Sequence, residues 1–266
     1  MIALLLGALL SASGSPMPFA EAPAVEVWAG EDWPADALAS ASRLPGATLG
    51  LALKSNMLRP EAAAVLRKGR ASLVRLAPGL SQVHVDELRG LPKTTLVVPL
   101  AGPLDATLSR LLEKLGPQPQ RVTLGKLDAA VAASLASLKH AEVELDLRGR
   151  VPDQEELGIF LGLSRVQRVV RLRADDPPAI VAALKAVKPV RLVVESVEGR
   201  VPEAMTAALI EAGIATRVAV DLTATPDDLK RLAALPRVSL ELRLSGDADI
   251  VVPKARGLLE SLVVAR

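Results

Sequence analysis

The stretch Val143-Glu144-Leu145-Asp146-Leu147-Arg148 alternates strictly between apolar and charged residues. This two-residue period is typical of a β-strand with one dry face and one wet face. Similar patterns begin near residues 170, 190, 217 and 238. The region 141–245 therefore predicts a series of alike strands, each carrying a row of charges on one side.

Helical spacing separates these strands, as in residues 227–235. Alternation of strands and helices with short connections indicates parallel strands joined by crossover helices. Counting back, strands are expected to start near residues 25, 48, 73, 95, 121, 142 and 169 as well. The mean spacing is about 24 residues, which is in the range of repeat proteins. The chain is thus expected to repeat one βα unit.

The strand face away from the helices would be strongly charged. Burying so many charges in a closed barrel would cost several kcal/mol for each one that is not fully paired. An open, solvated sheet avoids this cost, so we expect the charged face to contact water and a protein partner. The candidate partner-binding residues are Glu144, Asp146, Arg148, Arg171, Arg173, Asp175, Arg191, Glu195, Arg217, Asp221, Glu241 and Arg243.

Two leucine-rich segments, residues 235–240 (Leu-Pro-Arg-Val-Ser-Leu) and 138–145 (Leu-Lys-His-Ala-Glu-Val-Glu-Leu), begin such units. In length and order the units resemble leucine-rich repeats of the ribonuclease-inhibitor-like subclass, although the family's asparagine ladder is not kept. The resemblance implies a curved solenoid whose sheet lines a concave, protein-binding wall. The predicted fold class is therefore α/β, a βα-repeat solenoid (leucine-rich-repeat-like horseshoe) with a parallel sheet.

The alternative fold is a compact (βα)8 TIM-type barrel, which duplicated βα units would also suit. One property separates the two folds. In a barrel, Arg171, Arg173 and Arg191 should be buried, whereas in a solenoid they should be exposed.

Composition limits the classes of function. The chain has no cysteine, which excludes disulfides and thiolate chemistry. Its net charge is +2 and aromatic residues make up only 2% of it, so nucleic acid is not an expected partner.

The start of the chain predicts a compartment. Residues 2–10 form an apolar run followed by small residues, which resembles a secretory signal too short to span a bilayer. We expect residues 1–22 to be a signal peptide and linker, and 23–266 to be a single βα-repeat domain of about ten units. The expected location is secreted or periplasmic, without stable membrane insertion after cleavage.

No catalytic constellation is recognisable, and neither a P-loop nor a dinucleotide-binding fingerprint occurs. Acidic pairs such as Asp175-Asp176 and Asp227-Asp228 follow strand ends, where helix capping explains them, and Asp247 and Asp249 are less easily explained. The predicted function is an exported, non-catalytic protein-binding or scaffold protein with no cofactor or metal. The alternative is a TIM-barrel-type enzyme or small-ligand binder that uses acidic residues at the carboxyl ends of its strands.

Local signals predict where helices begin. The motif Gly149-Arg150-Val151-Pro152-Asp153 recurs with a conservative change at 199–203, so each proline is expected in the first helical position. Thr225 and Asp228 have the spacing of a capping box. Residues 79–94 predict only a turn, and the tail 258–264 fits either a strand or a helix. Trp28 and Trp33 are expected to cover an open end of the core, or alternatively to form a sugar platform.

Overall fold

A computed structural model describes residues 25–263 except 45, 70–71, 92, 116–117, 137, 139–140, 164–165, 186–189 and 244–245. The predicted signal peptide lies outside the described residues. Ten strands and ten helices alternate along this part of the chain. The strands are β1 (Val25–Gly30), β2 (Ala47–Ala52), β3 (Ser72–Arg75), β4 (Thr94–Leu100), β5 (Gln120–Leu124), β6 (Ala141–Asp146), β7 (Gln167–Arg173), β8 (Arg191–Glu195), β9 (Thr216–Val220) and β10 (Val238–Leu242).

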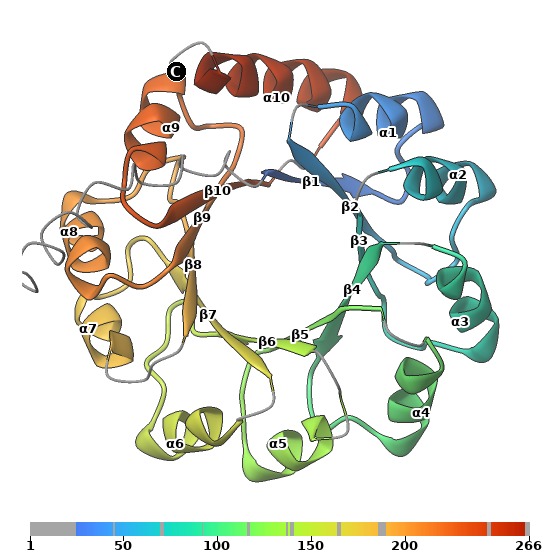
Figure 1. Ribbon diagram of the computed structural model, residues 1–266, viewed down its shortest axis with the longest axis horizontal. Coiled ribbons are helices and arrows are strands. Elements are labelled where there is room, and N and C mark those ends of the chain that lie inside the picture. Colours follow the sequence, from blue (N-terminus) through green and yellow to red (C-terminus); the bar gives the residue numbers. More distant parts are fainter. Residues whose placement is uncertain are drawn as a thin grey trace, which may run out of the picture.

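The helices follow the strands one by one and form the outer layer of the molecule (Figure 1). They are α1 (Ala35–Ser42), α2 (Pro60–Lys68), α3 (Gln82–Arg89), α4 (Ala106–Lys114), α5 (Ala129–Leu135), α6 (Gln154–Gly162), α7 (Ala179–Lys185), α8 (Glu203–Ala212), α9 (Pro226–Ala233) and α10 (Ala248–Val263).

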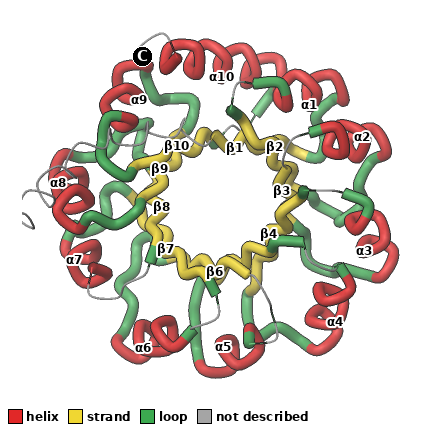
Figure 2. The backbone as a smooth tube through the Cα atoms, in the orientation of Figure 1, coloured by secondary structure: helices red, strands yellow, loops and turns green. Residues whose placement is uncertain are grey.

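All neighbouring strands pair in parallel and in chain order, from β1 to β10. The sheet curves until β10 lies beside β1, and the strands form a ring inside the helices (Figure 2). Among the described residues no strand pairing joins β10 to β1, so the barrel is nearly closed, with a seam. The indole Nε1 of Trp33 crosses this seam by donating to the carbonyl of Gly246 at 3.1 Å.

The predicted solenoid and the leucine-rich-repeat resemblance are therefore wrong. The α/β class with a parallel sheet is confirmed, and the fold corresponds to the barrel alternative, with ten strands where that alternative had eight. The prediction failed because it treated the charges as unpaired, whereas the barrel pairs them. More strands also make a wider barrel, which leaves room for long side chains.

The main core lies between the sheet and the helices. Apolar strand residues such as Val143, Leu145, Val170 and Leu172 point outward and are almost fully buried by the helices. Side chains alternate along a strand, so the charged residues between them point into the barrel.

Helix starts follow the sequence signals only in part. The capping box of Thr225 and Asp228 is confirmed, with Pro226 in the first turn of α9. Pro202 instead lies at the N-cap of α8, one residue earlier than predicted. The turn predicted for 79–94 is wrong, because α3 forms there. The tail, left open between strand and helix, continues α10 through Val263.

Candidate functional site

A connected ion network fills one side of the barrel. Its cross-barrel contacts show that the charged side chains share the interior: Arg121 on β5 contacts Glu26 on β1 at 3.2 Å, and Arg217 on β9 contacts the same carboxylate at 3.0 Å. We call this set the inner ion network. Its members are Glu26, Arg121, Glu142, Glu144, Asp146, Arg148, Arg171, Glu195, Arg217, Glu241 and Arg243.

Glu195, the last residue of β8, joins three arginines of the network. Its carboxylate lies 2.6 Å from Arg148, 3.0 Å from Arg171 and 2.6 Å from Arg243. Arg171 also forms a two-pronged pair with Glu144, with N–O distances of 2.7 and 2.9 Å. Charge-assisted pairs of this geometry are among the strong hydrogen bonds of proteins. These ion pairs therefore compensate the desolvation cost of burying the charges.

Arginines lower the pKa of two acids of the network, Glu241 and Asp146. Burial alone would raise the pKa of Glu241, but the charges of Arg243 and two further arginines hold that pKa below its ordinary value. Burial likewise acts to raise the pKa of Asp146, but hydrogen bonds from Arg148 outweigh it and lower that pKa. These two carboxylates consequently act as fixed negative charges at neutral pH.

A cavity of about 670 Å³ opens where β5 to β8 end, at the carboxyl mouth of the barrel. Its volume is in the range of small-molecule sites. The charged lining is balanced, with three arginines and three acids. These residues are Asp146, Arg148, Arg150, Arg173, Glu195 and Glu198.

Two of the lining residues have free hydrogen-bonding capacity. Within the described part of the chain the Arg173 guanidinium pairs with Asp175 alone, through Nε and Nη2, and both side chains are about half exposed. Glu198 is exposed, and its carboxylate has no hydrogen-bond or ion-pair partner among the described residues. Glu198 also has a positive φ of 50°, which is uncommon for a residue other than glycine. The cavity thus offers an available donor and an available acceptor to a ligand.

Hydrogen bonds between neighbouring loops hold this mouth in shape. Asp176 is buried and accepts from the backbone N–H of Gly149 at 3.1 Å and of Arg173 at 2.7 Å. Glu156 likewise accepts from the N–H of Leu127 at 2.9 Å. On the opposite side, buried Asn56 exchanges two hydrogen bonds with the Ala77 backbone, both at 2.7 Å. Such ties preorganise a ligand site.

The other side of the barrel is lined differently. On β1 the indole of Trp28 lies against Gly50 of β2, where a Cβ would come within 2.6 Å of the ring. The Arg75 guanidinium stacks on the same indole, 5.0 Å from the ring centre. Burial and the charges of Arg243 and Arg171 lower the pKa of Arg75. Trp28 therefore does not cover an open core end; it fills space inside the barrel, whereas Trp33 lies at the seam.

The structure brings most of the predicted partner-binding residues together on the inner face, where they are exposed to different degrees. Glu144, Arg171 and Glu241 are buried, at 3%, 4% and 0% exposure. Arg173 and Arg191 remain exposed because they lie near the two open ends of the barrel. The expectation that a barrel would bury Arg171, Arg173 and Arg191 alike is therefore wrong for the last two.

The remaining members of that set lie at the carboxyl mouth or deeper in the network. Asp221 follows β9, and its side chain accepts from the backbone of Thr223 at 2.8 Å. Glu26, Arg121 and Glu142 were not among the predicted residues, although each lies in an alternating strand segment. Glu198 was not predicted either; the available signal was that it directly precedes the second copy of the glycine-arginine-valine-proline motif.

The predictions of an exported scaffold function and of a non-catalytic protein are therefore wrong. Both rested on an open charged sheet, and the barrel encloses that face. A protein partner could reach this inner face only at the two ends of the barrel. The fold favours the alternative, an enzyme or small-ligand binder.

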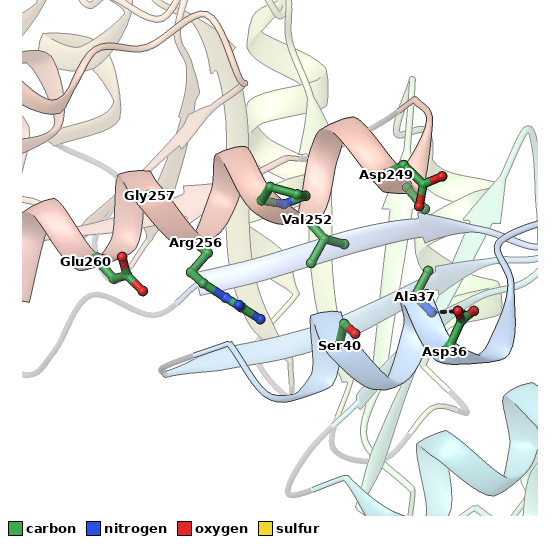
Figure 3. A pocket seen from close by; sticks show the side chains of 10 residues that line it. Asp36, Ala37, Ser40, Asp249, Val252, Arg256, Gly257 and Glu260 are labelled. Atoms are coloured by element: carbon green, nitrogen blue, oxygen red, sulfur yellow. Dashed lines mark hydrogen bonds between the residues drawn. The ribbon is translucent and has the colours of Figure 1, made fainter.

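A second cavity lies outside the barrel, between α1 and α10, and has a volume of about 420 Å³. Figure 3 shows Val252 and Arg256 of α10 directed toward Ser40 and Ala37 of α1. The two helices cover the seam between β1 and β10. Asp249, the acidic residue left unexplained by the sequence, lies at this groove, and its N–H bonds to Asp247 at 3.0 Å.

The described residues hold no group of three His, Cys, Asp or Glu side chains placed to bind a metal ion. They also contain no helix that is both long and apolar enough to cross a membrane.

Comparison with known proteins adds little to this picture. No protein-family model matches the chain, and no curated protein does. Among solved structures it is similar to tryptophan synthase from M. tuberculosis, at 13% identity and a TM-score of 0.41, over 92% of this chain and 93% of that one. A likeness at this level carries no argument about activity, so the site must be interpreted from its own geometry.

Proposed function

We propose that this chain is a barrel-type enzyme or small-ligand-binding protein whose site is the carboxyl mouth of the barrel. The observation that carries the proposal is the cavity of about 670 Å³ at the ends of β5 to β8. Arg173 provides it with a positively charged donor and Glu198 with a negatively charged acceptor. Ligand sites of parallel α/β barrels lie at this end, since the loops that vary are there. The balanced charge suits a small polar ligand that carries both an anionic and a cationic or hydroxyl group.

An enzymatic role would assign the proton transfer to Glu198. It is the carboxylate of the cavity that arginine does not already hold, so it is free to accept a proton from a ligand. Glu195, by contrast, is engaged by three arginines. Arg173 would orient the anionic group of the ligand.

The test is a thermal-shift screen with a panel of amino acids and sugar acids, followed by calorimetric titration of any stabilising compound. Arg173→Ala should weaken binding at least about tenfold, because it removes a charge-assisted contact worth more than about 1.4 kcal/mol. Arg168→Ala, at the other end of β7, is the matched control: Arg168 is half-buried, its guanidinium donates to the Leu161 carbonyl at 2.9 Å, and its loss should leave the affinity unchanged. A panel without a stabilising compound, or equal affinity in both variants, would contradict the proposal.

Enzyme and binder can then be separated. The stabilising compound is incubated with the protein and followed by proton NMR. Conversion that is lost in Glu198→Gln identifies an enzyme with Glu198 as its base. A compound that stays intact for days identifies a binder.

A further inference from the structure

The opposite, amino-terminal mouth of the barrel contains a separate cavity of about 250 Å³. It lies between the first residues of β6 to β10. Three arginines line it, Arg191, Arg217 and Arg237, against a single carboxylate, that of Glu142. That carboxylate is already held by Arg121 at 2.7 Å. The lining therefore has an excess of positive charge, unlike the balanced carboxyl mouth.

Arg191 is the best placed of these cations to receive an anion. Its guanidinium faces an amide rather than a carboxylate: with the Gln167 amide oxygen turned toward it, that oxygen lies 2.6, 2.7 and 3.1 Å from Nε, Nη1 and Nη2. A neutral amide oxygen compensates a full charge poorly, and an anion that displaces it would gain a charge-assisted, two-pronged contact. The site is thus charged but not neutralised.

The neighbouring groups are donors as well. Both ion-pair contacts of Arg217, to Glu26 at 3.0 Å and to Glu241 at 3.5 Å, use Nη1 alone. Ser239 adds a hydroxyl for which no partner is found among the described residues. Several donors converging on one small cavity match the several acceptor oxygens of a phosphate group.

The cavity also has an apolar part. Val169 and Val193 are about 3% and 2% exposed and belong to a small apolar cluster with Ala219 on the inner face. This cluster lies between the amino-terminal arginines and Glu195, since Val193 separates Arg191 from Glu195 along β8. It provides a dry surface for a short organic group attached to the phosphate.

From these contacts we propose that the amino-terminal mouth is a second ligand site, which binds a phosphate group, as a small phosphate monoester or as free phosphate. The site is independent of the ligand at the carboxyl mouth. Arg191 is its main anchor, with Arg217 and Arg237 completing the cationic wall.

The experiment is calorimetric titration of the full chain with inorganic phosphate and, separately, with glycerol 3-phosphate, at an ionic strength held constant with sodium chloride. Saturable binding of one or both is expected. Tighter binding of the ester identifies a monoester ligand, and equal binding identifies free phosphate. An absence of saturable binding to both compounds would overturn the proposal.

Variants locate the binding. Arg191→Gln and Arg237→Gln should each weaken phosphate binding, the first by at least about tenfold. Arg168→Gln removes the same charge from a half-buried position on β7 and should leave phosphate binding unchanged. Arg173→Ala, at the other mouth, should also leave it unchanged, which separates this site from the proposed ligand site there. Equal loss in Arg168→Gln and Arg191→Gln would show unspecific charge attraction and reject the site.

Discussion

The barrel interior is filled in two different ways. On β2 to β4 the inward residues are mostly small or apolar, such as Gly50, Leu73 and Val97, and the Trp28 indole occupies the space above Gly50. On β5 to β10 the inward residues are mostly glutamate and arginine, joined in the inner ion network. Both halves use the same parallel pairing. The comparison shows that backbone pairing does not dictate how the inside of a wide barrel is filled.

The two fillings also differ in what they make available. The half formed by β2 to β4, called the neutral half although Arg75 stacks on the Trp28 ring there, is filled by an aromatic ring packed against a glycine. The charged half holds fixed charges at defined positions and leaves cavities at both of its ends. Ligand recognition is therefore expected in the charged half, and the neutral half is expected to serve stability.

The largest effect should follow removal of a central charge. In Arg171→Ala the buried Glu144 carboxylate loses its two-pronged partner, and we expect the free energy of unfolding to fall by about 3–5 kcal/mol. Urea denaturation measures this. Arg173→Ala lies on the same strand and face but about half exposed, and it should cost less than about 1 kcal/mol. Equal costs for the two variants would show that the network is not buried in solution.

A smaller effect should come from the neutral half. In Gly50→Ala the new methyl group would meet the Trp28 ring at 2.6 Å, and repacking should cost about 1–3 kcal/mol. Gly125→Ala is the control, since its Cβ would meet nothing within 4 Å. The same denaturation measurement, together with a change in Trp28 fluorescence, checks the result. A Gly50→Ala protein as stable as the control would mean that the indole does not rest on this glycine.

The smallest effect should be a loss of stability of the charged half in acid. It is small because burial raises the pKa of Glu241 while the arginines lower it. A lowered pKa in the folded protein means that this group stabilises the fold above about pH 4.5, its ordinary value, and that the contribution disappears as pH falls further. Thermal melts between pH 7 and pH 3 should show the loss. Glu241→Gln should flatten the profile, and an unchanged profile would argue against the folded-state pairing.

Much of the candidate site was visible in the sequence as chemistry but not as geometry. Glu144, Arg171 and Glu195 were assigned to one face of the sheet because alternation along a strand is a local property. Their partners could not be assigned, since Arg121 meets Glu26 from 95 residues away. Glu198 was not singled out, because its place at the mouth depends on the tight turn it forms with Gly199.

By itself, the sequence determined where strands begin, which side chains point outward to the helices, and how Thr225 caps α9. Each of these depends on contacts within a few residues or on one repeating period. Only the tertiary structure decided whether the charged face meets water or its own far wall. Closure depends on the summed rotation between ten strands, and no single strand carries that information. In the nearly closed barrel, opposite charges from distant strands pair, and the charged face forms an interior that opens at both ends.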